Sequence, residues 1–159
     1  MDPKKYRDTV YKIIGAAMTV HEELNWGLLE AIYEEALSLE LHDIGIDNKR
    51  QEEITTYYKH HLMEKKYKMD IVVDDIVIEL KSTKNICSAH RAQLCNYLRL
   101  THKPIGLIIN FGAKSLQGER WIYDEETNEC ILVDKKMEPV FPNEDLFNDG
   151  SEYIEPQMT

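Results

Sequence analysis

The sequence contains little cysteine and no long hydrophobic run. Its 159 residues include only three cysteines, Cys87, Cys95 and Cys130, and none of them forms a CxxC pair. No apolar run approaches the roughly 18 residues that a membrane-spanning helix needs, and the first ten residues are too polar for a signal peptide. These absences predict a cytoplasmic protein with free thiols and no membrane segment.

Motifs of several enzyme classes are also missing. No GxGxxG or GxxxxGK segment occurs, so no nucleotide-binding loop is indicated. The six histidines form neither an HExxH motif nor a cluster with cysteine, which argues against a zinc site. The 19 Lys and Arg residues are outnumbered by 29 Asp and Glu residues, giving a net charge of −10. This balance argues against a broad basic surface for nucleic acid but leaves room for a local basic groove.

The acidic residues are unevenly distributed along the chain. Residues 137–159 hold six acids, three prolines and no Lys or Arg. We therefore expect a single domain over residues 1–136 and a loosely ordered acidic tail over 137–159. A chain of this length buries roughly 68–70% of its unfolded surface, which is enough for a core without disulfides.

Hydrophobic periodicity predicts a mixed α/β fold. Apolar residues recur at helical spacing up to about Asn25, and a second helix follows Gly27 and ends near Gly45. Strands are predicted within 52–58, 61–73 and 76–82, a helix capped by Ser88 over 89–100, a buried parallel strand within 104–112 and a hairpin within 120–134. Helices flanking one mixed central sheet are the natural packing for this order.

The segment YKMDIVVDDIVIELKST, residues 67–83, places charges inside its two strands. If Asp74 and Asp75 form a two-residue turn, Asp70 lies opposite Glu79, and Lys81 projects from the same face. The other face is then wholly apolar, with Met69, Ile71, Val73, Ile76, Ile78 and Leu80.

Opposed carboxylates, with Cβ atoms about 4.5–5.5 Å apart, destabilise a sheet. A Mg²⁺ ion, which proteins usually hold with one or two carboxylates, would compensate for their repulsion. The alternative is an ordinary solvated strand face, which the hairpin alone favours. Two helical residues shift this balance, because Glu30 heads an otherwise apolar helix stripe and Gln93 follows the hairpin on the next helix. Each taken alone fits an ordinary role, a first-turn acid and a surface glutamine.

Together these features resemble the PD-(D/E)xK nuclease superfamily. That superfamily typically has an acid on a hairpin, followed after eight residues by E-x-K. It also typically has an acid on the helix before the hairpin and a glutamine on the helix after it. Within it, the segment WGLLEAIYEEAL, with Gly27, Glu30 and Tyr33, resembles the signature of the GxxExxY protein family. The hairpin, HRAQLCNYLRL and GLIINFG follow in that family's order, so the resemblance extends to Gly112.

The resemblance implies an αβββαβ nuclease core that hydrolyses phosphodiester bonds with Mg²⁺ or Mn²⁺. It implies metal ligands and catalytic residues as follows: Asp70, Glu79 and the Leu80 carbonyl for the metal, with Lys81, Glu30 and Gln93 as catalytic residues. The substrate would be DNA or RNA. The alternative is a non-catalytic module that binds nucleic acid or protein on the same fold. A chain with little besides the core is also compatible with a homodimer or a protein partner.

Overall fold

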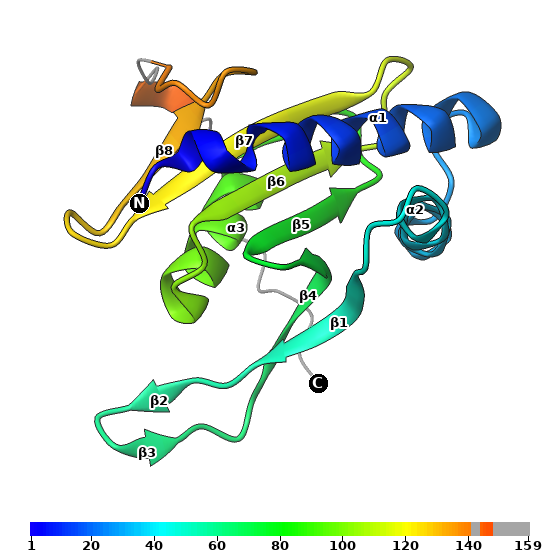
Figure 1. The fold of residues 1–159 in the computed structure, drawn as a ribbon. Helices are drawn as coiled ribbons and strands as arrows, with labels where there is room; N and C mark the ends of the chain where they lie inside the picture. Colours follow the sequence, from blue (N-terminus) through cyan, green and yellow to red (C-terminus); the bar gives the residue numbers. More distant parts are fainter. Residues whose placement is uncertain (141–143, 148–159) are drawn as a thin grey trace.

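A six-stranded mixed sheet forms the centre of the molecule (Figure 1). The computed structural model describes residues 1–140 and 144–147. The sheet order is β1-β4-β5-β6-β7-β8, with these bounds: β1 Lys49–Ile54, β4 Tyr67–Val73, β5 Ile76–Lys81, β6 Ile105–Asn110, β7 Gln117–Asp124 and β8 Glu129–Val133. β5 and β6 run parallel and the other neighbours are antiparallel. The predicted mixed sheet, its buried parallel strand and the last hairpin are confirmed.

Helices cover both faces of this sheet (Figure 1). They are α1 Arg7–Leu24, which follows the 3-10 turn η1 Pro3–Tyr6, then α2 Glu30–Asp43, α3 Ser88–Thr101 and the 3-10 turn η2 Glu144–Phe147. α1 and α2 pack against one face and α3 against the other. The order α2-β1-β4-β5-α3-β6 is the expected αβββαβ core. No helix in the described part of the chain is long and apolar enough to cross a membrane.

The predicted hairpin register is confirmed over its closed part. Val73 pairs with Ile76 and Ile71 with Ile78, and Asp74 has the positive φ of 49° that a two-residue turn requires. The predicted apolar face is confirmed except at Met69, which packs on the α3 side of the sheet. Strand alternation is interrupted next to Met69, because the neighbouring position on β1, Gln51, has a φ of 53° and no ladder partner.

A small two-stranded ribbon extends from β1 and β4 away from the rest of the fold (Figure 1). It consists of β2 Tyr57–Tyr58 and β3 His61–Leu62, paired antiparallel. Two residues join β1 to β2 but four join β3 to β4, so the pairing register shifts by two residues at the base of the ribbon. Extra residues on one strand bend it, which accounts for the change of direction. We call residues 55–66 the arm.

The expectations that all cysteines are free thiols and that Ser88 caps a helix are wrong. Cys95 on α3 and Cys130 on β8 form a disulfide, with Cα atoms 5.9 Å apart, whereas Cys87 is free. The two cysteines are 35 residues apart and come together only because α3 packs beside the sheet edge, so sequence spacing carries no signal of the bond. The cytoplasmic expectation loses the support of free thiols. Ser88 lies within α3, and the N-cap is Cys87.

Ordered contacts continue past residue 136. Met137 is 1% exposed and packs in the core beneath α1, and Pro139 bridges to Val133 on β8. Most of the expected acidic tail, 137–159, lies outside the described residues. The division into a domain and a tail therefore stays a prediction.

Candidate active site

The start of α2 is fixed by the residues around it. Gly27, with a φ of +86°, donates its backbone N–H to the Phe111 carbonyl over 3.2 Å. The fully buried Tyr33 ring stacks on Phe111 at 4.5 Å, and its hydroxyl donates to the Asn25 carbonyl over 2.7 Å. The glycine and tyrosine of the WGLLEAIY segment thus anchor the turn that precedes Glu30, the first residue of the helix.

Asp70 and Glu79 are held by hydrogen bonds to the opposite strand. The Asp70 N–H donates to Glu79 Oε1 over 3.0 Å, and the Leu80 N–H donates to Asp70 Oδ2 over 2.8 Å. The backbone ladder between β4 and β5 ends at the preceding pair, Ile71 and Ile78, so these carboxylates take the place of carbonyl acceptors. Glu79 is only 2% exposed. Both acidic side chains are therefore positioned rigidly at the point where the strands separate.

Burial raises the pKa of each acid in this group. The pKa of Asp70 rises to about 6, chiefly because the carboxyl is desolvated, and the charge of Glu34 adds to the rise. The pKa of Glu79 is also well above its usual value because of burial and the charge of Asp70. Partial desolvation raises the pKa of Glu30 as well. The positive charge of Lys81 opposes the rise in all three cases, so one lysine influences all three acids.

Lys81 itself is oriented by α3. Its Nζ donates to Gln93 Oε1 over 2.7 Å, and Gln93 Nε2 donates to the Tyr97 hydroxyl over 3.3 Å. Tyr97 is 2% exposed. The structure therefore brings the predicted residues of the hairpin and both helices to one place at the end of β5.

Three residues that the sequence analysis missed also belong to this group. Glu34, only 6% exposed, pairs with Arg50 Nη2 over 3.0 Å and accepts a hydrogen bond from Gln51 Nε2. The same Gln51 Nε2 lies 3.4 Å from Asp70 Oδ1. Glu34 had a detectable signal, because it lies one helical turn after Glu30 on the same face. Arg50 and Gln51 had none, because they arrive from β1.

The donor set fits a hydrated hard cation and does not form a complete protein cage. In the described part of the chain, no three histidine, cysteine or acidic side chains form a metal-ligand cluster. One buried and one half-buried carboxylate, both with raised pKa values, do lie side by side, however, and a cation would relieve their repulsion. Mg²⁺ keeps several waters and takes one or two carboxylates. Asp70 and Glu79 meet that requirement.

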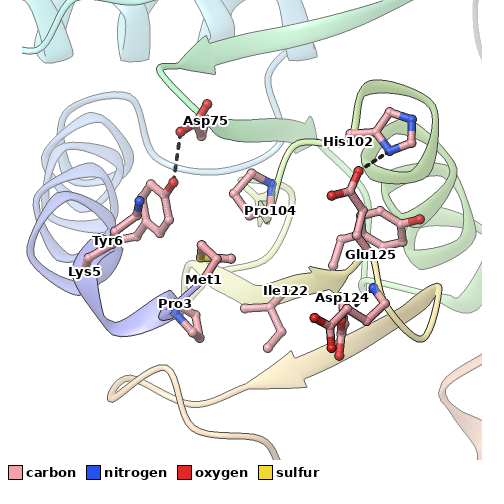
Figure 2. A pocket seen from close by; sticks show the side chains of 12 residues that line it. Met1, Pro3, Lys5, Tyr6, Asp75, His102, Pro104, Ile122, Asp124 and Glu125 are labelled. Atoms are coloured by element: carbon pink, nitrogen blue, oxygen red, sulfur yellow. Dashed lines mark hydrogen bonds and ion pairs between the residues drawn. The ribbon is translucent and has the colours of Figure 1, made fainter.

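A separate hollow lies at the opposite end of the hairpin (Figure 2). Its volume is about 670 Å³, and Asp75 of the β4–β5 turn lies on its wall, where it accepts a hydrogen bond from Tyr6 over 2.9 Å. On the other side, His102 Nδ1 lies 2.7 Å from Glu125 Oε1. The hollow includes none of the site residues and is distinct from the candidate site.

Comparison with known proteins places the chain in a family. Residues 7–121 match the sequence model of the PD-(D/E)XK nuclease superfamily. The crystal structure of SSO0001 is similar at 18% identity and a TM-score of 0.46, over 77% of this chain and 63% of that one, so this chain spans less than two thirds of that protein. A comparison with curated proteins finds no match. The superfamily match covers most of the sequence and the whole site, and the chain therefore belongs to the PD-(D/E)XK nuclease superfamily.

Proposed function

We propose that the protein is a Mg²⁺- or Mn²⁺-dependent nuclease that hydrolyses phosphodiester bonds of DNA or RNA. The observation that carries the proposal is the pair of carboxylates formed by the buried Glu79 and the half-buried Asp70, with Lys81 beside them. Two desolvated acids next to each other are costly for a fold, and their presence at the end of a strand favours a functional role. Superfamily membership supplies the reaction class.

In this proposal each side chain has a distinct role. Asp70 and Glu79 would hold the cation, and the Leu80 carbonyl would supply a third protein oxygen. A bound divalent cation supplies charge neutralisation at the scissile phosphate and a more acidic water. Lys81 donates a hydrogen bond to the attacking water or to the phosphate oxygen that gains charge. Glu30, whose pKa is raised by partial desolvation, would exchange a proton with the attacking water.

Gln93 is a positioning residue in this scheme. Its Oε1 accepts the Lys81 hydrogen bond and its amide is held by Tyr97, so the ammonium points in a defined direction before substrate arrives.

We also propose that the chain belongs to the GxxExxY family. The structural roles of Gly27 and Tyr33 beneath Glu30 support this, because they explain why those residue types precede and follow the acid.

The test separates metal binding from chemistry. Titration calorimetry with Mn²⁺ should show binding to the wild type and to Lys81→Ala, and none to Asp70→Ala or Glu79→Ala. Cleavage of plasmid and single-stranded substrates should require the metal and fall at least 100-fold in Lys81→Ala. Asp43→Ala is the matched control, because Asp43 is an exposed acid at the far end of α2. Absence of metal binding in the wild type at millimolar cation would contradict the proposal.

One observation favours the alternative of a non-catalytic binding module. Asp70 and Glu79 already accept backbone hydrogen bonds, so they have a structural role without a metal. That alternative predicts nucleic-acid or protein binding that Lys81→Ala leaves unchanged, together with no cleavage by the wild type in any divalent cation.

A further inference from the structure

The arm combines exposed aromatic rings with positive charge. Tyr57 is 65% exposed and Tyr58 is 59% exposed, and Leu62 beside them is 55% exposed. All six residues from 57 to 62 are exposed, and they contribute nothing to either core. A ribbon of this kind gives little stability to the fold, so its apolar rings call for another explanation.

The charge of the arm is opposite to that of the remaining chain. Residues 55–66 contain three lysines and one glutamate, a net charge of +2, whereas the other 16 basic and 28 acidic residues give −12. Lys59 Nζ lies 5.5 Å from the centre of the Tyr58 ring, and Lys65 is exposed. Lys66 is paired with Glu53 at 3.3 Å, so Lys59 and Lys65 are the lysines directed to solvent. His60 and His61 lie in the same ribbon.

Both faces of the ribbon present a stacking ring. Tyr57 pairs with Leu62 and Tyr58 with His61. Because successive strand residues point to opposite faces, the two tyrosines lie on opposite faces of the ribbon. Aromatic rings beside lysines are the elements with which proteins bind single strands, since bases stack on the rings and the lysines contact phosphates.

We propose that the arm binds single-stranded nucleic acid and holds it next to the active site; this rests on the nuclease proposal above. β4 leads from the arm directly to Asp70, eight residues after Leu62, so the two are separated by at most about 29 Å of extended chain. A single strand is favoured over a duplex, because the tyrosines stack only on bases that are free of their neighbours. The occupant is therefore the substrate strand beside the scissile bond.

A second copy of this chain is the main competing occupant, because the acidic body would also attract a basic arm. The paired arrangement of a lysine beside a ring favours nucleic acid, since a protein surface needs no such platform. The experiment below measures self-association separately.

Binding is measured by fluorescence anisotropy with labelled oligothymidylate and oligouridylate, in EDTA and again with Ca²⁺, at several salt concentrations. The double variant Tyr57→Ala/Tyr58→Ala should raise Kd about tenfold or more. Lys59→Gln/Lys65→Gln should reduce the slope of log Kd against log salt by about 1.4. The matched controls are Tyr11→Ala and Lys12→Gln, exposed residues of α1, which should bind as the wild type does. Thermal unfolding midpoints should be equal for all variants, because the arm lies outside the core.

Several outcomes would overturn the proposal. They are a wild type that binds neither oligonucleotide, arm variants with unchanged Kd, and arm variants that lose self-association in light scattering while still binding strands. The outcome for the nuclease proposal is separate. Strand binding that depends on the arm, without cleavage in Mg²⁺ or Mn²⁺, would contradict the nuclease proposal but support the proposal for the arm. Cleavage with a normal rate and KM in the arm variants would contradict the proposal for the arm but support the nuclease proposal.

Discussion

Asp70 occupies a position at which its ionised form is unfavourable. Its carboxyl is desolvated and lies near the charges of Glu34 and Glu30, and the Leu80 N–H offsets only part of this. A metal-free fold that contains such a group is less stable than the same fold with a neutral side chain there. The cost depends on pH, because protonation removes it.

Asp70→Asn should therefore stabilise the metal-free protein above pH 6. The folded pKa of about 6 exceeds the ordinary 3.8, so between about pH 4 and pH 6 the folded state keeps a proton that the unfolded state has lost. Wild-type stability consequently falls as pH rises through this window and levels off above it. Urea unfolding in EDTA should show the variant more stable by up to about 3 kcal/mol at pH 7 and nearly equal to the wild type near pH 4. Asp43→Asn is the control, and a variant advantage that does not depend on pH would contradict the prediction.

At the residue level, prediction from sequence succeeded where strand and helix periods apply. The positions of Asp70, Glu79 and Lys81 follow from period two and a two-residue turn, and the structure has that turn. Met69 was misplaced because the backbone is irregular beside it, at the left-handed Gln51, which periodicity does not encode. Arg50 was missed because it reaches the site from a different strand, β1. Which roles these side chains perform stays a prediction.

At the scale of elements, the loop after β5 is fastened to the end of β6. Thr83 is bound by Asn110, whose Oδ1 accepts its N–H over 3.0 Å and whose Nδ2 donates to its carbonyl over 2.9 Å. Gly112 lies against the same loop, and a Cβ there would overlap the backbone of Ser82 and Thr83. The β6 end and the β5 end are thus in backbone contact.

Gly112→Ala should destabilise the protein by about 3 kcal/mol or more and displace the loop beside Lys81, because backbone atoms cannot rotate away as a side chain can. Gly118→Ala is the matched control, since its nearest atoms would be 3.7 Å from the added methyl group. Urea unfolding of both variants measures the difference. Equal stability of the two variants would show that the loop moves freely.

The disulfide joins α3, which carries Gln93, to the edge strand β8. Thiol titration of the unfolded, unreduced protein should find one reactive thiol, Cys87, and three after reduction. Closure of a loop of 35 residues predicts that Cys130→Ser lowers stability by roughly 4 kcal/mol, whereas Cys87→Ser should have little effect. Three reactive thiols without reduction would show that the bond is not formed.

Elements were more predictable than their contacts. The large helices and the buried strands β4, β5 and β6 follow from apolar periods in the sequence, and the order of the elements led to the αβββαβ core. β1, Lys49–Ile54, begins before the predicted strand 52–58, because five of its six residues are polar and give no apolar period. From the sequence, the arm was not distinguished from the strands on either side of it. Thr55, Thr56 and the residues around Glu64 show no apolar pattern that would mark where the strand pairing changes register. The disulfide was missed because it depends on tertiary packing alone.

At the scale of the whole molecule, the net charge of −10 bears on the test of the proposed cation site. Mg²⁺ at 100 times its Kd would stabilise the fold by about 2.7 kcal/mol, which is a rise in Tm of about 5–10 °C for a chain of this size. Thermal unfolding should show this rise in the wild type but not in Asp70→Asn. Sodium chloride at matched ionic strength is the control, because screening of the net charge of −10 also affects stability. An equal rise in sodium chloride would assign the effect to screening.

Between β4 and β5, two backbone N–H groups donate to carboxylates instead of to backbone carbonyls, and this has a consequence for NMR spectroscopy. The amide protons of Asp70 and Leu80 point at the two carboxylates, Glu79 and Asp70 respectively. Their chemical shifts therefore respond to any change in charge on those oxygens, whether a proton or a cation causes it. Two amide resonances, with no label beyond ¹⁵N, are enough to follow the state of the site in solution while the remaining spectrum reports on the fold.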